Sequence, residues 1–391
     1  PVRVVTADGT AGGPPPYRLM ENQYSLLDKT DLVFIDAPGT GFSRLVGAGT
    51  PKEFFGVDQD VAAFSQFIQT YITKFDRWNS PKFLFGESYG TTRSAALVDV
   101  LQHQDVSFNG VLLLSSILSF GLDYSRSTIA AGDWAYVLYL PTEAATAWYH
   151  HKANRNIPLD TFVEQARKFA LGDYMSALAK GADLDPAEKS GIVRRLHDFT
   201  GLSQQYIRES NLRVPYNRYQ NELLRREGKS VGRLDSRFET YTLDSAAEGP
   251  DWDPADVSLS APFVSTFNHY VREDLKYATE AHYYPTHYDF VSRAWDLKHA
   301  REEPPNVAPD LAEAMTTNPH LHVFSANGYY DFATPFFATD YTLRHLNLNP
   351  ALQKNITYGY YDSGHMVYIH ESALAKFKSD VARWYDMVLA R

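Results

Sequence analysis

The chain has 391 residues, of which 44% are hydrophobic, and its 23 glycines and 21 prolines fit an ordinary globular composition rather than a fibrous or disordered one. With 47 acidic residues against 37 lysines and arginines, the net charge of −10 argues against nucleic acid or an anionic membrane surface as a partner. The lack of cysteine excludes disulfides, a thiolate nucleophile and cysteine-bound zinc, and no apolar run approaches the roughly 18 residues that membrane insertion requires.

Apolar runs and helical patterns alternate in the first part of the chain. The predicted strands are 31–36, 82–86 and 110–118, and the predicted helices between them are 57–75 and 92–102. Each strand is apolar along nearly its whole length, which indicates burial on both faces. Because strands separated by helices pair in parallel through right-handed crossovers, we expect an α/β fold with a mostly parallel, doubly wound sheet.

From about residue 121 to residue 317 the strand signal disappears. Helical patterns at 158–181 and 260–277 are joined there by polar stretches, which indicates a mostly helical insertion, or cap. The alternation then resumes with strands at 320–326 and 355–362 and helices at 335–347 and 372–390. We therefore expect three parts: residues 1–118 and 318–391 form the core, and residues 119–317 form the cap.

Gly86-Glu87-Ser88-Tyr89-Gly90 fits the G-x-S-x-G nucleophile elbow, a sharp turn between a strand and a helix that holds a serine hydroxyl clear of the sheet. The same letters could be a glycine-rich turn with a capping serine. The motif follows the predicted strand 82–86 and precedes the predicted helix 92–102, so we favour the elbow, with Ser88 as the nucleophile.

A serine nucleophile needs a histidine base, and the histidine needs a carboxylate that orients it. Asp331 follows the predicted strand 320–326, and His365 follows the predicted strand 355–362, so the order along the chain is Ser, Asp, His as in α/β-hydrolases. A single loop aspartate is usually a turn residue, and a single histidine is usually structural; the order of all three favours a catalytic role. The remaining histidines are expected to be structural or solvent-facing, including His150, His151, His282 and His287.

Two weaker patterns resemble a metal site and a dinucleotide-binding loop, but each lacks residues that such a site requires. Asp251, Asp253 and Asp256 lie close together, but the segment lacks the glycine and the distal glutamate of a calcium loop, so we interpret it as a solvated turn and expect no metal. Gly39-Thr40-Gly41 follows a predicted strand, but Arg44 stands where a dinucleotide loop has its third glycine. No cofactor is expected.

Four motifs in order along the chain resemble the serine carboxypeptidase family, peptidase family S10. They are GESYG, the segment 22–43, the NGYYD that ends at Asp331 and the SGHM around His365; the wording GESYGTTR resembles the bacterial members. The resemblance implies an α/β-hydrolase fold, a peptide or small acyl substrate, and a periplasmic or secreted location. It also implies a role for six residues: Ser88 as nucleophile, His365 as general base and acid, Asp331 as its orienting carboxylate, the Tyr89 backbone N–H as an oxyanion donor, Glu87 in recognition of the substrate's C-terminal carboxylate, and Met366 in the pocket for the leaving residue.

One segment of the family pattern does not occur in this sequence. The family's Asn-Gly-Gly-Pro-Gly run supplies the second oxyanion N–H, and PVRVV at 1–5 looks like the strand just beyond it. The run at 12–16 is glycine- and proline-rich but follows that strand and is expected to be a loop. Loss of one donor costs about 100- to 1000-fold in turnover, so two alternatives stay open: the chain as given has a weakened oxyanion site, or a segment before Pro1 completes it.

Three functions are compatible with these observations. The leading one is a serine carboxypeptidase that works through an acyl-enzyme. A second keeps the same three residues but transfers the acyl group to an alcohol, as some relatives of the family do. A third, prompted by the absent oxyanion segment, is a non-catalytic binding protein. The preferred side chain at the cleaved bond and the oligomeric state stay open.

Overall fold

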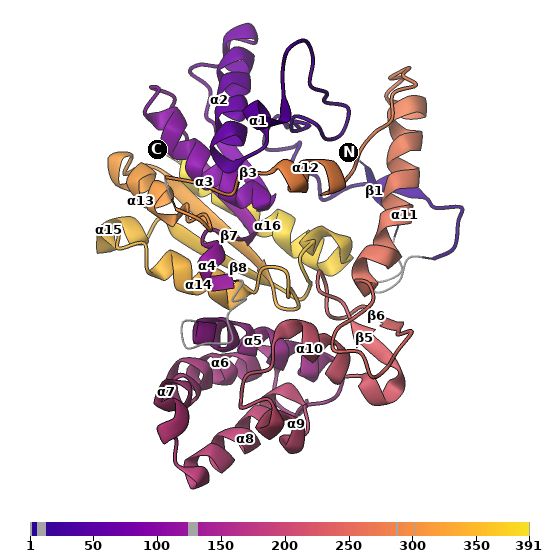
Figure 1. Cartoon of the computed structure of the whole chain (residues 1–391). Coiled ribbons are helices and arrows are strands. Elements are labelled where there is room, and N and C mark those ends of the chain that lie inside the picture. The colour runs from indigo at the N-terminus through magenta and orange to yellow at the C-terminus, as the bar shows by residue number, and fades with distance from the viewer. Residues whose placement is uncertain (1, 6–12, 124–131, 287, 301, 391) are drawn as a thin grey trace.

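A four-stranded parallel sheet forms the centre of the protein, whose computed structural model describes residues 2–5, 13–123, 132–286, 288–300 and 302–390 (Figure 1). The strand order is β3-β4-β7-β8, with the bounds β3 (Phe83–Ser88), β4 (Gly110–Ser116), β7 (His322–Gly328) and β8 (Ile356–Tyr361). All three pairings are parallel. The predicted α/β sheet is therefore confirmed, with β4 and β7 adjacent although the chain between them is long.

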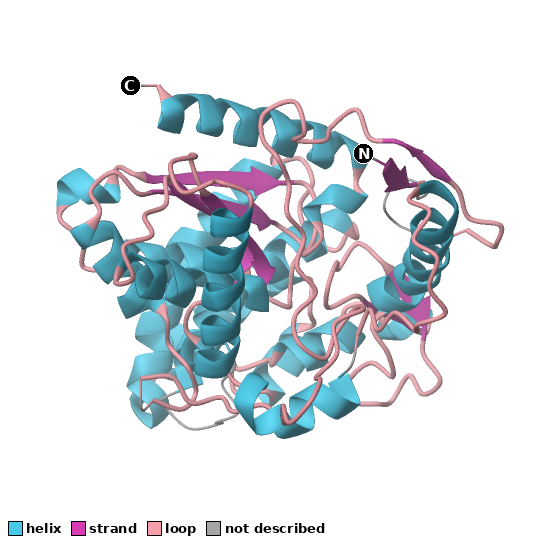
Figure 2. Ribbon diagram, turned by 90° about the horizontal axis from the view of Figure 1, so that it is seen from above, coloured by secondary structure: helices cyan, strands magenta, loops and turns pink. Residues whose placement is uncertain are grey.

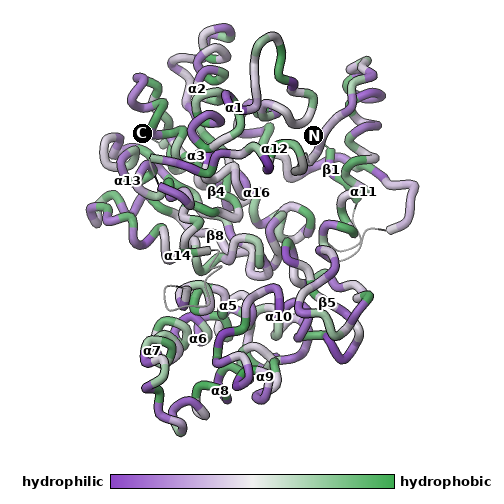
Figure 3. Tube along the Cα trace, in the orientation of Figure 1, coloured by the Kyte–Doolittle hydropathy of each residue, from purple (hydrophilic) through white to green (hydrophobic). Residues whose placement is uncertain are grey.

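Helices cover both faces of this sheet, and side chains of β4 alternate between them. Val111 and Leu113 pack against the helices α2 (Val57–Lys74), α3 (Tyr89–Gln102) and α13 (Ala308–Thr317). Leu112 and Leu114 face α16 (Glu371–Leu389) on the opposite side. In Figure 2, α16, which ends near the C mark, runs along one side of the strands, and several other helices lie on the opposite side. Burial on both faces explains the apolar run at 111–114 of β4, and hydrophobic segments lie around this strand in Figure 3.

The predicted strand at 31–36 is wrong, because no strand forms in this segment. Within the described residues β3 pairs only with β4, so its other edge has no strand partner. A groove of about 460 Å³ lies between that edge and the 30–35 segment. Val33 and Phe85 line this groove and are 46% and 47% exposed. An apolar run becomes a strand only if a neighbour accepts its backbone hydrogen bonds, and β3 is too far away to do so.

The chain between β4 and β7 is mostly helical, and Figure 1 shows α5 to α10 gathered on one side of the sheet. The helices are α5 (Asp133–Tyr149), α6 (Leu159–Phe169), α7 (Met175–Lys180), α8 (Pro186–Thr200), α9 (Gln204–Glu209), α10 (Tyr216–Glu222) and α11 (Pro254–His269). The shared core of α5 to α10 also contains Tyr330, Phe332 and Phe336, which follow β7, whereas α11 packs in a separate cluster. The insertion therefore packs directly on the loop that carries Asp331.

Several elements differ from their predicted bounds. The single helix expected at 158–181 is divided into α6 and α7 by a π-helical turn at 170–174. The helix expected at 260–277 starts earlier, as α11, and gives way to a π-helical turn at 270–274. Sequence analysis also missed an antiparallel hairpin in the insertion, β5 (Lys229–Val231) and β6 (Glu239–Tyr241), because each strand has only three residues.

The remaining elements are short. They are β1 (Val2–Val4), which pairs antiparallel with β2 (Leu19–Glu21), and the helices α1 (Pro51–Phe54), α4 (Phe120–Asp123), α12 (Tyr288–Ala294), α14 (Phe336–Arg344) and α15 (Pro350–Gln353). Residues 13–16 form a loop, whereas Gly12 of the predicted loop lies outside the described residues. Among the described residues no helix combines the length and apolar character needed to cross a membrane.

Candidate active site

Ser88 is the last residue of β3, and α3 begins at the next residue. Its backbone angles, φ 55° and ψ −125°, lie in a region that residues with a side chain rarely adopt. A Cβ on Gly86 would lie 2.1 Å from the Gly90 carbonyl oxygen, whereas a Cβ on Gly90 would meet nothing within 4 Å. The strand and the helix thus approach so closely that Gly86 is required, while Gly90 is not required for space.

Asp331 lies in the turn after β7 and is only 1% exposed. One carboxylate oxygen, Oδ1, accepts hydrogen bonds from the backbone N–H groups of Ala333 and Thr334, at 2.7 and 3.0 Å. The other, Oδ2, accepts from the Thr334 hydroxyl at 2.7 Å and lies 2.8 Å from His365 Nδ1. The carboxylate is therefore held in one orientation, with Oδ2 directed at the imidazole.

His365 follows β8 and is 5% exposed. Its main chain is fixed on both sides, because the His365 N–H donates to the Leu234 carbonyl at 2.7 Å and the Ser115 hydroxyl donates to the His365 carbonyl at 2.7 Å. Burial lowers the pKa of His365, but the Asp331 and Glu87 carboxylates raise it, and the net shift is upward. The Asp331 carboxylate, which has the larger effect, can thus stabilise the imidazolium that forms when a histidine acts as a base.

Ser88 and His365 both lie near the end of β4. Ser88 is paired with Ser116 across the sheet, and the neighbouring Ser115 holds the His365 carbonyl. Within the described residues, the Ser88 hydroxyl makes no hydrogen bond to the His365 ring. Such contacts are often long in free enzymes and shorten when substrate binds.

Glu87 lies beside this group and accepts a hydrogen bond from the Tyr368 hydroxyl at 3.1 Å. Burial raises the pKa of Glu87, and the charge of His365 and the Tyr368 hydroxyl only partly oppose that effect. A buried carboxyl group with a raised pKa, adjacent in sequence to the candidate nucleophile Ser88, is a typical feature of a functional site.

The other two predicted site residues have different surroundings. Tyr89 is the first residue of α3, where backbone N–H groups have no partner within the helix. Its ring packs edge-on against Trp295 at 5.1 Å between ring centroids. Met366 follows His365 and packs on an apolar cluster that includes Phe238 and Leu259 of the insertion.

Sequence analysis missed the residues that support these side chains. Thr334 and Ser115 gave no signal, because isolated hydroxyl residues are common in loops. Asp253, predicted to lie in a solvated turn, instead caps α11 and accepts hydrogen bonds from the Arg233, Leu234 and Ala255 N–H groups. Burial raises its pKa. The Asp-Pro dipeptide at 253–254 is a typical helix start and could have revealed this role.

The described histidines among the four that the sequence analysis named as structural or solvent-facing contact neighbouring side chains or main-chain atoms. The His150 ring lies 2.6 Å from the Ser236 carbonyl, His151 contacts Arg155, and the exposed His282 packs against Tyr284. His287 lies outside the described residues.

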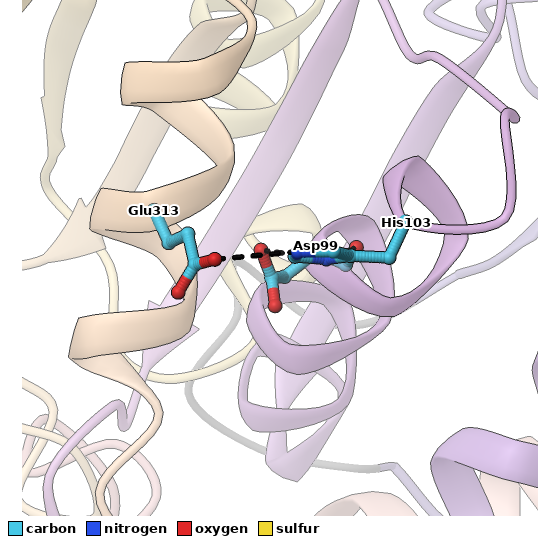
Figure 4. Close-up of side chains that lie close together, drawn as sticks. All are labelled: Asp99, His103 and Glu313. Carbon is cyan, nitrogen blue, oxygen red and sulfur yellow. Dashed lines mark hydrogen bonds and ion pairs between the residues drawn. The ribbon is translucent and has the colours of Figure 1, made fainter.

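One group of side chains in the described part of the chain has spacing compatible with a metal ion: Asp99, His103 and Glu313 (Figure 4). Ion pairs already join His103 to both carboxylates, at 3.6 and 3.3 Å, and His103 and Glu313 are more than half exposed. Burial raises the pKa of Asp99 to about 6. Ordinary ion pairing accounts for this cluster, and we assign no metal to it.

A parallel sheet with helices on both faces, a serine at the turn after one strand and a His–Asp pair after two others define the α/β-hydrolase class. The chain belongs to the serine carboxypeptidase family, whose sequence model matches residues 13–374. It is thereby placed among the serine-type carboxypeptidases, which are hydrolases of peptide bonds. The likeness to bacterial members stays a prediction.

Comparison with solved structures agrees with this fold. Kex1, a prohormone-processing carboxypeptidase from Saccharomyces cerevisiae, matches with a TM-score of 0.54 and 15% identity over 99% of this chain and 78% of that chain. Proline iminopeptidase from Mycobacterium smegmatis gives a TM-score of 0.33 and 12% identity over 87% and 74%, which is too low to support an argument. Comparison with curated proteins gives no match.

Proposed function

We propose that this protein removes the C-terminal residue of peptides through an acyl-enzyme on Ser88. The observation that carries the proposal is the 2.8 Å contact between His365 and Asp331, both buried, beside a serine in a strained turn. The rare backbone conformation of Ser88, at the turn between a strand and a helix, is the feature expected of a nucleophile elbow.

The reaction needs one proton carrier and no cofactor. As the Ser88 oxygen bonds to the carbonyl carbon, the unprotonated His365 Nε2 takes the hydroxyl proton and Asp331 stabilises the imidazolium. The C–N bond then breaks and His365 passes the proton to the leaving amine. His365 next takes a proton from a water molecule that attacks the acyl-enzyme, and returns it to Ser88 as the acid product leaves.

The negative charge on the carbonyl oxygen requires donors that are already in place. We assign one of them to the Tyr89 backbone N–H, because it lies at the start of α3, where the helix dipole adds to the attraction. The supporting packing is an ion pair between Arg93 of α3 and Asp60 of α2, at 2.6 and 3.1 Å.

Glu87 and Met366 are assigned to substrate recognition. Burial keeps the Glu87 carboxyl protonated to a higher pH than usual, so it can donate a hydrogen bond to the substrate's C-terminal carboxylate. Met366 is assigned to the pocket of the leaving residue, where its flexible thioether adapts to side chains of different shape. We also assign residues 119–317 the role of a cap over the site, since they pack on the Asp331 loop.

The test is the Ser88→Ala variant, with Ser190→Ala on the exposed face of α8 as a matched control. We expect Ser88→Ala to fold but to lose both release of the C-terminal residue from an N-blocked dipeptide and labelling by a fluorophosphonate. His365→Ala should add no further loss in the double variant, because the two residues act together.

Ser190→Ala should behave as the unchanged protein does. Labelling of Ser88→Ala at the unchanged rate would refute the proposal, and absence of labelling in the unchanged protein would favour a non-catalytic binding protein.

A further inference from the structure

The loop of the β5–β6 hairpin lies between the two loops that carry Asp331 and His365. We call residues 233–237 of this loop the bridging segment. The Phe332 N–H donates to the Arg233 carbonyl at 3.0 Å, and the Ser236 N–H donates to the Tyr330 carbonyl at 2.9 Å. The His365 N–H donates to the Leu234 carbonyl at 2.7 Å. The backbone of the bridging segment is thus bonded to residues adjacent to Asp331 and to His365 itself.

A buried ion pair stiffens this segment. The Arg237 guanidinium donates to both carboxylate oxygens of Asp235, at 3.0 and 2.6 Å, and the two residues are 4% and 0% exposed. The pair also reaches the catalytic loop, because the Gly364 N–H donates to Asp235 Oδ2 at 3.0 Å. Arg237 in turn donates to the Asp362 carbonyl at 3.0 Å.

The bridging segment, the end of β7 and the loop before His365 are packed as closely as their backbones allow. A Cβ on Gly364 would lie 2.5 Å from both Asp235 Cβ and the Leu234 carbonyl oxygen. A Cβ on Gly328 would lie 2.1 Å from the Gly364 carbonyl oxygen. Three backbone segments distant in the sequence are therefore in direct contact beside the His–Asp pair.

The bridging segment is also held by Asp253, the residue that caps the N-terminus of α11. Asp253 accepts hydrogen bonds from the Arg233 N–H at 3.2 Å and the Leu234 N–H at 2.9 Å. These two residues use their N–H groups toward α11 and their carbonyl groups toward the catalytic loops. Asp253 and the two catalytic loops therefore hold the bridging segment between them by hydrogen bonds.

We infer that Asp235 and Arg237 are positioning residues that set the His365 ring in line with Asp331 through the bridging segment. This inference rests on the proposed function of the site. A buried ion pair is weak evidence for stability alone, since well-packed apolar residues often replace such pairs without loss. Here each member also bonds to the main chain of residues 362–364, immediately before His365.

The charged groups that face the His365 ring are Asp331, Glu87 and Arg233. Burial lowers the pKa of His365 and the Asp331 contact raises it, so a ring that moves away from Asp331 should titrate at lower pH. A displaced ring therefore changes the pH profile, which a loss of folded protein alone does not.

The test uses the double variant Asp235→Asn with Arg237→Met, which removes both charges and leaves neither partner buried alone. We expect kcat per active site to fall about 10- to 100-fold, because small misplacements of a catalytic group cost that much. KM should stay nearly unchanged, and the acid limb of kcat/KM should move to lower pH. Arg237→Lys keeps the positive charge but not the two parallel hydrogen bonds to Asp235, and its kcat should fall less than that of the double variant.

The matched control is Arg167→Met with Asp340→Asn. This ion pair also joins the insertion to the core, at 2.7 Å with Asp340 2% exposed, but its further hydrogen bond comes from the Tyr360 hydroxyl of β8 and not from the main chain beside Asp331 or His365. Its removal should leave the pH profile and kcat per site unchanged. Active sites are counted with a fluorophosphonate, so a fall in the folded fraction does not imitate a fall in rate.

The outcomes separate this inference from the proposed function. An unchanged kcat per site and pH profile in the Asp235–Arg237 double variant would overturn the inference, and so would equal losses in the control. If Ser88→Ala is inactive in the same experiment, the proposed function still stands. Full activity of Ser88→Ala would overturn both.

Discussion

Ser88 has a backbone conformation that its side chain disfavours, and this has a cost in stability. A rare φ, ψ combination costs about 1–3 kcal/mol in a residue with a Cβ, whereas glycine adopts it freely. Replacement by glycine adds about 0.5–1 kcal/mol of unfolded-state entropy, which offsets part of that gain. We expect Ser88→Gly to exceed Ser88→Ala in unfolding free energy by about 1 kcal/mol, measured by urea denaturation. A lower value for Ser88→Gly would show that the turn is unstrained.

The raised pKa of Glu87 predicts a specific pH dependence of substrate binding. Its raised pKa means that the protonated form, which can bind a carboxylate, persists at acid pH and is lost as pH rises through that pKa. KM for a free-acid peptide should therefore increase between about pH 4 and about pH 8, while KM for the matched C-terminal amide changes little.

The control for this prediction is Glu87→Gln, which keeps a hydrogen-bond donor but does not titrate. The variant should have a KM for the free acid that is nearly independent of pH. Parallel profiles for acid and amide in both proteins would exclude Glu87 as the group that binds the carboxylate.

The sequence predicted the elbow residues because the motif is local: its glycine, its serine and the adjacent strand and helix all lie within a few residues. Asp331 and His365 were predicted from their order and their positions after strands. Asp235 and Arg237 could not be predicted, because an isolated Asp-Ser-Arg run looks like a solvated turn. Their burial depends on a hairpin inserting between two loops roughly 100 residues away in sequence.

At the scale of elements, the His299 imidazole joins its own loop to the helices α2 and α13. Its two ring nitrogens lie 2.7 Å from Asp58 of α2 and 3.0 Å from Asp310 of α13, and the residue is 7% exposed. Hydrogen bonds to Asp310 and Asp58 raise the pKa of His299 to about 9. The charged ring therefore connects α2 to α13 across the 295–302 loop.

This linkage should make stability fall at alkaline pH. A histidine with a raised pKa contributes fully below its unfolded pKa of about 6.5, and the contribution is lost as pH rises through about 9. Allowing for solvent around the exposed Asp58, we expect a loss of about 2 kcal/mol in unfolding free energy between about pH 6 and about pH 10. His299→Gln should lose much less over that range; an equal loss would assign the effect to other groups.

Element boundaries were harder to predict than element types. Buried strands such as β4 were recognised, because both of their faces are covered and four consecutive residues, 111–114, are large and apolar. The apolar segment 31–36 gave the same signal, but it has no pairing partner and stays extended without a sheet. Strand formation depends on a neighbour, which a single stretch of sequence does not reveal.

At the scale of the molecule, the edge of β3 that pairs with no strand in the described residues should promote association of the 391-residue chain with itself. An unpaired strand beside exposed apolar side chains such as Val33 and Phe85 offers a template for a second chain. The net charge of −10 opposes such contacts, so association should increase with salt.

Sedimentation velocity at several concentrations and at low and high salt measures this association. Val33→Glu, which places a charge at the groove, should reduce it. The control is Leu243→Glu, an equivalent change at an 81% exposed position near the β5–β6 hairpin. Association that is equal in all three proteins would show that the edge of β3 does not participate.

The pairing of β4 with β7 also sets the time at which this site can exist in a growing chain. About 280 residues separate Ser88 from His365, and synthesis at about 5–20 residues per second spends roughly 14 to 56 seconds between them. Until β7 and β8 have been made, β4 has one unpaired edge and Ser88 lacks its proposed base. A protease built in this order cannot cleave peptides, its own unfinished chain included, before the last strand of its sheet is in place.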